Sequence, residues 1–219
     1  MKRNFIILGL QGSGKGTQAR LLSEKLNIPV ISMGEITRRS RERNDKIGQI
    51  ARSYYDSGKL FPADLIGDLL EVELKKLDLN KGVIFEGVPR NIQQVEIFDR
   101  ILRKLDISEP ILIYLNISKE TGFKRISGRK VCSECNTPIL PLDSNYSSGA
   151  CKKCGGELII RPDDQPDAIK KRIDSYFKET EPVIKLYKKA GYLIEINGEP
   201  KVEEVDKEVN IKIKRLGVI

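Results

Sequence analysis

The feature that most constrains the fold is a glycine-rich run between a short apolar stretch and an amphipathic one. It reads Gly9-Leu10-Gln11-Gly12-Ser13-Gly14-Lys15-Gly16-Thr17. Glycines in this pattern let successive backbone N–H groups turn toward one point, and a lysine can reach an anion held there. A buried strand, a glycine loop and a helix, in that order, form the context in which such a loop binds phosphates. The predicted phosphate-binding residues are Gly12, Ser13, Gly14, Lys15, Gly16 and Thr17.

The loop lacks a hydroxyl directly after its lysine. In the general form of the motif a Ser or Thr follows the lysine and binds magnesium. Here Gly16 occupies that position and Thr17 comes next. We therefore expect magnesium to be held through phosphate oxygens, water and a carboxylate elsewhere in the chain.

Apolar and amphipathic stretches alternate along the rest of the chain. Strands are expected at 3–9, 29–31, 83–85, 110–115 and 192–196. Helices are expected over 14–26, 92–105, 119–129, 165–189 and 202–215, and the segment 33–77 is mostly helical, with breaks near 44–45 and 57–62. Apolar strands without polar alternation, each followed by a helix, indicate a parallel sheet covered on both faces. The predicted fold class is therefore α/β, with a doubly wound parallel sheet.

Histidine is absent from all 219 residues. This absence excludes His-dependent acid–base relays, Ser-His-Asp triads and His metal ligands. The net charge of +8 indicates either affinity for polyanions, nucleotide phosphates included, or a Lys- and Glu-rich surface of the kind that hot-adapted proteins favour. Apolar runs stay well below the ~20 residues that span a bilayer. The N-terminal run leads into the glycine loop rather than into a cleavage site, so we expect a cytoplasmic protein.

The chain has four cysteines, and they form two Cys-x2-Cys pairs separated by 15 residues: Cys132, Cys135, Cys151 and Cys154. This spacing is typical of a zinc ribbon, in which two tight turns converge on one tetrahedral ion. Four thiolate ligands leave no open position, so the expected role of the zinc is structural. Two disulfides, or iron in place of zinc, are the alternatives, although disulfides are rare in a chain that stays in the cytosol.

Five further motifs follow the loop in a characteristic order. They lie at 31–38, at 57–60, at 85–90 with Gln94, at 125–129, and at 161–165 with Arg172. Together with the loop ending Gly-Lys-Gly-Thr, they resemble the adenylate kinases, a family of nucleoside monophosphate kinases, over essentially the whole chain. The resemblance implies reversible transfer of the γ-phosphoryl group from MgATP to AMP, giving two ADP.

The resemblance also implies roles for individual residues, and these agree with what phosphoryl transfer requires, namely two phosphate groups held in line with their charge neutralised. The implied catalytic residues are Lys15, Arg90, Arg125, Arg129, Arg161 and Arg172. ATP is expected to bind the phosphate loop together with Arg125, which packs against adenine, and Arg129. The implied AMP-binding residues are Ser32, Met33, Gly34, Arg38, Lys59, Leu60, Gly87, Arg90, Gln94, Arg161 and Arg172. Glu86 would orient magnesium-bound water, and Asp163 and Asp164 would hold arginines in place.

The expected organisation is a core of 1–31, 67–127 and 165–219 with two inserted segments. One is a helical acceptor segment that binds the monophosphate, at 32–66, and the other is a zinc-binding lid segment at 128–164. The lid segment is too small to bury much apolar surface, so the metal is expected to supply its stability. Its closure would exclude water from the reaction. A monomer is the default expectation, and a trimer like those of archaeal relatives stays open.

Among the departures from the family pattern, one lies in the phosphate loop and one near the acceptor base. Gln11 stands where the loop usually has proline, which should make the loop more flexible. Met33 stands where the family usually has threonine near the acceptor base, and a thioether is only a weak hydrogen-bond acceptor. Because base selection depends on buried polar groups, we expect acceptors beyond AMP, although Gln94 argues that AMP remains among them.

Two other functions stay open. One is a kinase that prefers another nucleoside monophosphate, namely CMP, UMP or GMP. The other belongs to a different class, a zinc-ribbon ATPase that binds nucleic acid through the basic knuckle residues Lys152 and Lys153. That second function would leave Arg38, Arg90 and Gln94 without a purpose.

Overall fold

A parallel sheet forms the centre of the molecule. The computed structural model describes residues 3–57, 59–139, 146–161 and 164–217, except the side chains of 55–57, so Gly58 and Asp163 lie outside the described residues. The strands of the central sheet are β1 (Arg3–Gly9), β2 (Val30–Ser32), β3 (Gly82–Glu86), β4 (Ile111–Asn116) and β8 (Leu193–Asn197). They pair in the order β2-β3-β1-β4-β8, and every pair is parallel. The predicted fold class, a doubly wound parallel α/β sheet, is confirmed.

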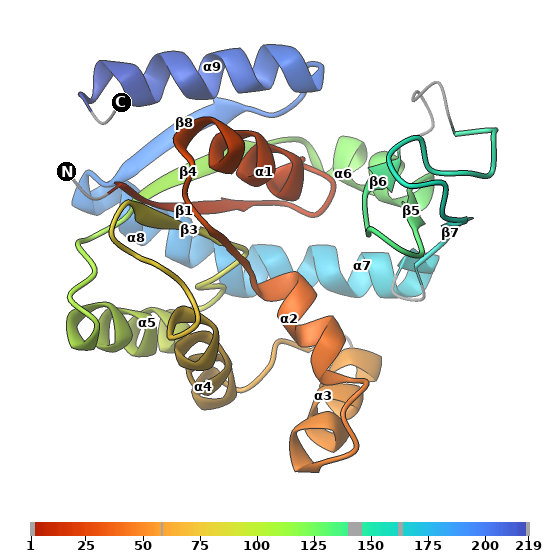
Figure 1. Cartoon of the computed structure of the whole chain (residues 1–219), viewed down its shortest axis with the longest axis horizontal. Helices are drawn as coiled ribbons and strands as arrows, with labels where there is room; N and C mark the ends of the chain where they lie inside the picture. The colour runs from red at the N-terminus through yellow and green to blue at the C-terminus, as the bar shows by residue number, and fades with distance from the viewer. Residues whose placement is uncertain (1–2, 58, 140–145, 162–163, 218–219) are drawn as a thin grey trace.

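Helices cover both faces of this sheet, as Figure 1 shows. On one face lie α1 (Lys15–Leu26) and α9 (Val202–Arg215), which pack on Phe5 and Ile7 of β1. On the other face lie α4 (Ala63–Leu74), α5 (Ile92–Lys104), α7 (Pro166–Ser175) and α8 (Glu181–Ala190), which pack on Ile6 and Leu8. Successive strand residues point to opposite faces, so the part of β1 that is buried on both sides, from Phe5 to Leu8, is apolar at every position. This explains why β1 shows no polar alternation.

The acceptor segment extends away from the sheet (Figure 1). It contains α2 (Met33–Ser40) and α3 (Lys46–Ser57), and it leads into α4. Ser32 caps α2, because its hydroxyl accepts a hydrogen bond from the backbone N–H of Glu35 at 3.4 Å. Between α2 and α3, Asp45 accepts from the backbone N–H of Gly48 at 3.0 Å and so begins the second helix. The expected breaks near 44–45 and 57–62 are therefore confirmed.

The long helix expected over 165–189 is interrupted by one wider turn. Residues Tyr176–Thr180 form a π-helical turn between α7 and α8, and the N–H of Glu181 donates to the carbonyl of Tyr176, five residues back. Pro182 has no N–H to contribute to the preceding turn, and α8 begins around it. The amphipathic pattern predicted a helical path but not this change of hydrogen bonding.

The lid segment forms a small sheet of its own. Helix α6 (Lys119–Ser127) leads into β5 (Lys130–Cys132), which pairs antiparallel with β6 (Pro138–Ile139) and β7 (Leu158–Ile159). Four buried residues form its apolar centre: Cys132, Ile139, Cys151 and Leu158. Within the part of the chain that the structure describes, no helix is both long and apolar enough to cross a bilayer.

Candidate active site

The phosphate loop lies at the carboxyl end of β1, where ligands of doubly wound sheets bind. Gly12 and Gly14 adopt positive φ angles of 84° and 90°, which a residue with a Cβ rarely adopts. Gly14 is also the N-cap of α1, and the helix begins at Lys15. The loop therefore lies at the positive end of the dipole of α1, where free backbone N–H groups can bind an anion.

Lys15 folds back over this loop. Its Nζ donates hydrogen bonds to the carbonyls of Gly9 at 2.8 Å and Leu10 at 2.9 Å. Burial lowers the pKa of Lys15 to about 7; Glu86 opposes the shift, and nearby arginines, chiefly Arg90, add to it. The charged form of Lys15 is therefore disfavoured in the unliganded site, and a bound anion would favour it.

Glu86 is the carboxylate whose charge acts on Lys15. It ends β3, only 8% of its surface is exposed, and it accepts a 2.7 Å hydrogen bond from the hydroxyl of Ser32. Ser32 pairs with it in register at the end of β2. Both side chains line the same cleft as the phosphate loop. This is the place expected for a carboxylate that orients magnesium-bound water.

Two arginines of the acceptor side converge on Gly34. A methyl group built on Gly34 would lie 3.4 Å from Nη1 of Arg38 and 3.9 Å from Nη2 of Arg90. The Nε of Arg90 donates to the carbonyl of Gly87 at 2.6 Å, in a loop that contains the cis peptide Val88–Pro89. Burial lowers the pKa of Arg90, as Arg172 and Arg38 also do, whereas Glu86 raises it. Two guanidinium groups so placed can grip one phosphate.

Four residues expected to contact AMP do not line this cleft: Met33, Lys59, Leu60 and Gln94. Met33 is 2% exposed and packs in the main apolar core, and Lys59 is exposed at the end of α3. Gln94 is 3% exposed, and its Oε1 accepts from the backbone N–H of Arg90 at 2.8 Å. Ser13, which was expected to bind phosphate, is also buried, at 2% exposure, and does not line the cleft. Motif positions do not show how deeply Met33 and Gln94 are buried, because their burial depends on how α2 and α5 pack.

Asp164 holds two arginines of the site. Its side chain is 0% exposed, and its carboxylate accepts from Nε and Nη2 of Arg129 at 2.9 and 2.7 Å and from Nη1 of Arg172 at 3.1 Å. A buried carboxylate held by two guanidinium groups fixes both of them in place. The prediction that Asp164 holds arginines agrees with this geometry. Arg161 lines the cleft as well.

Arg125 is bound to a different part of the site. Its Nη1 donates to the carbonyl of Gly198 at 2.8 Å and its Nη2 to the carbonyl of Glu199 at 2.7 Å. These bonds use the edge of the guanidinium group and hold it beside the loop that precedes α9. A guanidinium plane held in this way can stack on a base, as the sequence analysis expects.

The phosphate loop, Glu86 and the arginines of the site line one cleft of about 640 Å³. It also includes residues that were not expected at a nucleotide site: Asn136, Thr137, Pro138 and Lys153 of the lid segment, Tyr176 and Thr180 of the π-helical turn, and Val202 and Glu203 of α9. The lid residues directly follow or lie between cysteines, so the knuckle spacing could have indicated them. Thr180, whose hydroxyl donates to the carbonyl of Arg90 at 2.9 Å, carries no such signal.

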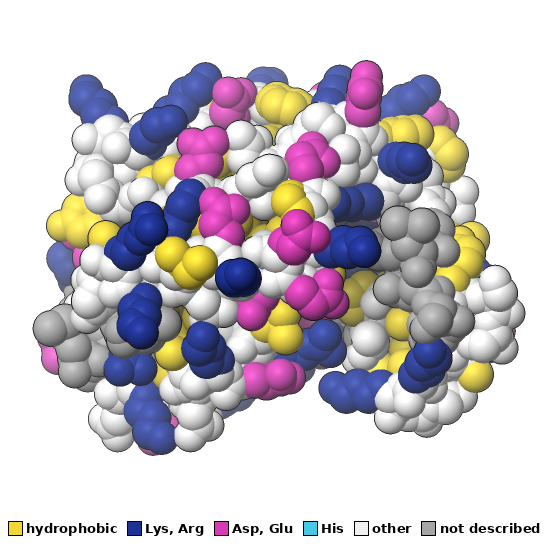
Figure 2. All heavy atoms as spheres, turned by 90° about the horizontal axis from the view of Figure 1, so that it is seen from above, with side chains coloured by type: hydrophobic (Ala, Val, Ile, Leu, Met, Phe, Trp, Pro, Cys, Tyr) yellow, Lys and Arg dark blue, Asp and Glu magenta, His cyan; other side chains and the backbone are white. Residues whose placement is uncertain are grey.

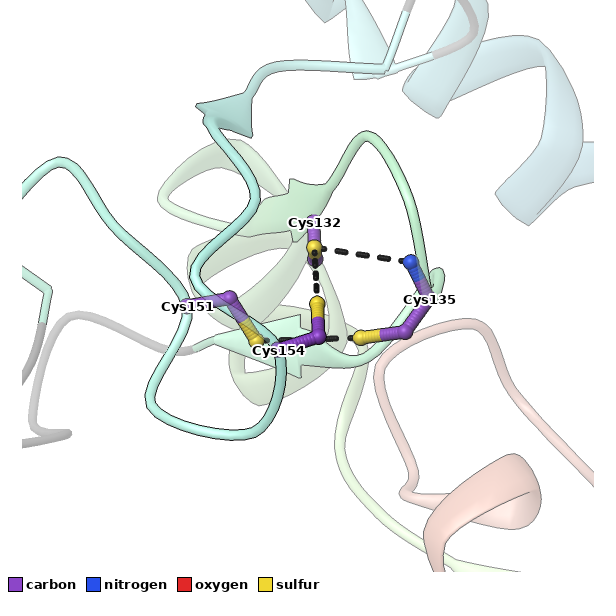
Figure 3. A group of neighbouring side chains, drawn as sticks. All are labelled: Cys132, Cys135, Cys151 and Cys154. Atoms are coloured by element: carbon purple, nitrogen blue, oxygen red, sulfur yellow. Dashed lines mark hydrogen bonds between the residues drawn. The ribbon is translucent and has the colours of Figure 1, made fainter.

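The four cysteine sulfur atoms converge on one point (Figure 3) and lie within 4.8 Å of one another. The separations of 3.4 Å between Cys132 and Cys154 and 3.7 Å between Cys135 and Cys151 are far longer than a disulfide bond. A tetrahedron with Zn–S bonds of about 2.3 Å has edges of about 3.8 Å. The cluster therefore fits a tetrahedral metal ion better than the disulfide alternative.

The two knuckles share one backbone geometry. In the first, the N–H of Asn136 donates to the carbonyl of Cys132 at 3.0 Å, and Asn136 has a φ of 55°. In the second, Gly155 and Cys151 make the equivalent bond at 2.8 Å, and Gly155 has a φ of 78°. Backbone N–H groups also point at the sulfur atoms of Cys132 and Cys151, at 3.5 and 3.4 Å. This arrangement stabilises thiolates, which are the metal-binding form of cysteine.

Comparisons with known proteins agree with this geometry. A sequence profile described as "Adenylate kinase" matches residues 7–192. A protein of that name from Methanocella arvoryzae is 40% identical over 215 residues, covering 97% of this chain and 99% of the relative. Others with the same name are 37% identical: one from Ruminiclostridium cellulolyticum covers 98% of this chain and 99% of its own, and one from Acetivibrio thermocellus covers 94% and 95%. The chain is a phosphotransferase that belongs to the adenylate kinase family.

Proposed function

We propose that the enzyme transfers the γ-phosphoryl group of MgATP to AMP, reversibly, giving two ADP. The observation that carries this is the arrangement of cations in one cleft. Lys15, Arg129 and Arg172 gather beside the phosphate loop, and Arg38 and Arg90 meet at Gly34. A cleft with two such groups accommodates two phosphate-bearing nucleotides, and phosphoryl transfer needs chiefly their alignment and charge neutralisation.

Each side of the cleft then has its own task. The phosphate loop and Lys15 bind the ATP phosphates, Arg125 stacks on the donor base, and Arg129, Arg161 and Arg172 neutralise the transferring group. Arg38 and Arg90 hold the AMP phosphate. Gln94 reads the base in this proposal, through its amide NH2 group, because its Oε1 is bound to the backbone N–H of Arg90. Bound magnesium neutralises the ATP phosphates, and Glu86, through water, orients the ion. A monomer is the form proposed, since this chain contributes residues to both the donor and the acceptor sides of the cleft.

Two segments close the site in this proposal. The lid segment (128–164) has its own small sheet and apolar centre, so it can move as a unit. The four cysteines would hold a structural zinc ion that replaces the larger core such a segment lacks. The acceptor segment (32–66) closes from the other side. Closure excludes water and so limits wasteful ATP hydrolysis.

Substitutions of Arg38 and Arg125 test the division between the acceptor and donor sides of the cleft. Arg38→Met is expected to raise the KM for AMP at least about tenfold and to leave the KM for ATP nearly unchanged, because one charge-assisted contact to phosphate is lost. Arg125→Met should do the reverse. Arg39→Met is the matched control, since Arg39 follows Arg38 in the same helix but its side chain is 65% exposed. Equal effects of Arg38→Met on both KM values would contradict the assignment.

We also propose that acceptors beyond AMP react. Met33 lies between Ser32 and Gly34, which line the cleft, and its thioether offers no strong hydrogen-bonding group to a base. A site that lacks such a group discriminates less strongly among bases. Met33→Thr should therefore raise the rate with AMP relative to CMP, UMP and GMP. If the unmodified enzyme phosphorylates CMP, UMP and GMP each at less than about 1% of the AMP rate, it discriminates strongly among bases and this part of the proposal is wrong.

The nucleic-acid alternative finds little support in the charge distribution. Figure 2 shows that basic and acidic side chains lie side by side over the face that includes α9, without a continuous basic stripe. Electrostatic binding of nucleic acid depends on such a stripe or patch. Cations do gather in the cleft, where nucleotide phosphates would bind.

A further inference from the structure

Gln11 makes a contact that none of the proposed roles explains. Its Nε2 donates a hydrogen bond at 3.2 Å to the backbone carbonyl of Arg172, 161 residues further along the chain. That carbonyl also accepts from the N–H of Tyr176, where α7 passes into the π-helical turn. The bond therefore joins the phosphate loop to the last turn of the helix that carries Arg172. The flexibility expected from the absence of proline is offset by this contact.

Close packing holds the same part of the loop against α6. A methyl group built on Gly122 would lie 2.7 Å from Cδ2 of Leu10 and 2.8 Å from the carbonyl oxygen of Gln11. A methyl group on Gly12 would lie 2.8 Å from the carbonyl of Gly122. Such distances leave no room for a side chain, so the loop rests directly on the backbone of α6. The loop is thus fixed to both helices that flank the lid segment.

The other end of the Gln11 amide indicates that this contact is not there for stability alone. Its Oε1 is buried and meets no hydrogen-bond donor among the described residues. An unpaired buried amide oxygen costs free energy, so an apolar side chain of similar size would cost less at this position. Unsatisfied buried groups of this kind call for an explanation from function.

We propose that Gln11 is a positioning residue for Arg172. Its amide holds the end of α7 to the phosphate loop and so aims Arg172, and through Asp164 also Arg129, at the transferring phosphoryl group. This inference rests on the role proposed above for Arg172. The phosphate loop and Arg172 on α7 must both contact the transferring phosphoryl group. A direct hydrogen bond between the loop and the backbone of α7 keeps the two aligned.

A double-mutant cycle tests this. Gln11→Met keeps the length of the side chain and removes the amide, and it should lower kcat about 3- to 10-fold, as the loss of one hydrogen bond predicts, with little change in the KM for AMP. In an Arg172→Lys background the same change should have almost no further effect, because the residue that it positions is already altered. Gln49→Met is the control, since Gln49 is exposed on α3, and its kcat should equal that of the unmodified enzyme.

The outcomes separate the two claims. If Gln11→Met lowers kcat by the same factor in both backgrounds, or not at all, Gln11 does not act through Arg172 and the inference is overturned, while the role of Arg172 stands. If Arg172→Lys alone leaves kcat unchanged, the proposed role of Arg172 fails, and the inference fails with it. If Gln11→Met does not fold, Gln11→Asn, which keeps the amide but shortens its reach, replaces it in the same cycle.

Discussion

Asp164 offers the sharpest test of how the arginines of the site are held. Asp164→Asn keeps the shape of the side chain and removes its charge. The carboxylate has no exposed surface, and it accepts two bonds from Nη2 and one from Nε of Arg129 as well as one from Arg172. Breaking a buried ion pair costs about 3–5 kcal/mol. Because the two guanidinium side chains remain 14% and 24% exposed, we expect the lower end, about 3 kcal/mol.

The measurement is thermal unfolding of the unliganded enzyme, followed by kcat. For a chain of this size, about 3 kcal/mol corresponds to a fall in Tm of roughly 6–12 °C. Saturating nucleotide should restore part of the loss, because its phosphates supply the negative charge that Asp164 no longer provides. The kcat should fall more than tenfold, since Arg129 and Arg172 lose the group that orients them.

Asp174→Asn is the matched control, on α7, which begins just after Asp164. Asp174 pairs with Lys119 at 3.4 Å, but both side chains are mostly exposed, at 73% and 62%. Exposed pairs contribute at most about 1 kcal/mol, so its Tm should change by no more than a few degrees. If Asp164→Asn is no more destabilising than Asp174→Asn and retains full kcat, the argument for Asp164 as the organiser of the arginines is refuted.

Three further predictions follow from the site. Lys15 has a folded-state pKa of about 7 against an ordinary value of 10.5, so between these values the unfolded chain binds more protons and the unliganded enzyme gains stability as pH rises. Phosphate should restore the high pKa, so calorimetry at pH 8.5 in buffers of different ionisation enthalpy should show uptake of close to one proton per nucleotide bound, and no uptake in Lys15→Arg. Glu86→Gln should lower kcat roughly 100-fold with little change in the KM for AMP. It should also lower the pKa of Lys15 further, because the charge of Glu86 raises that pKa. An unchanged dependence of the rate on magnesium would count against the role of Glu86. A strong chelator should release one metal ion per chain, make the four thiols reactive and lower the Tm; if metal analysis finds no ion in protein purified without chelator, the zinc assignment fails.

Local spacing made much of this site predictable. The phosphate loop, the two Cys-x2-Cys knuckles and Arg38 lie in short motifs whose geometry depends on neighbouring residues. Strand and helix positions followed from apolar periodicity, and the expected closing helix at 202–215 matches α9. Asp164 was also identified, because it lies in the motif that ends the lid segment.

Other features depend on contacts between distant parts of the chain. The burial of Met33 is decided by how α2 packs against the core, and a motif position does not contain that information. The π-helical turn changes which carbonyl each N–H meets without changing the amphipathic pattern. The bond from Gln11 to α7 joins residues 161 positions apart, and no spacing rule anticipates it. Sequence reasoning thus identified the groups that carry charge, but not all of the contacts that hold them.

The central claim is that one cleft holds MgATP and a nucleoside monophosphate for direct transfer. A coupled phosphotransfer assay tests it most directly, with MgATP supplied together with AMP, CMP, UMP or GMP, or without any acceptor. The account predicts rapid formation of ADP with AMP, slower but measurable reaction with the other monophosphates, and almost no loss of ATP when the acceptor is absent. Loss of ATP at the same rate with and without an acceptor would contradict it, because the cleft would then serve hydrolysis rather than transfer.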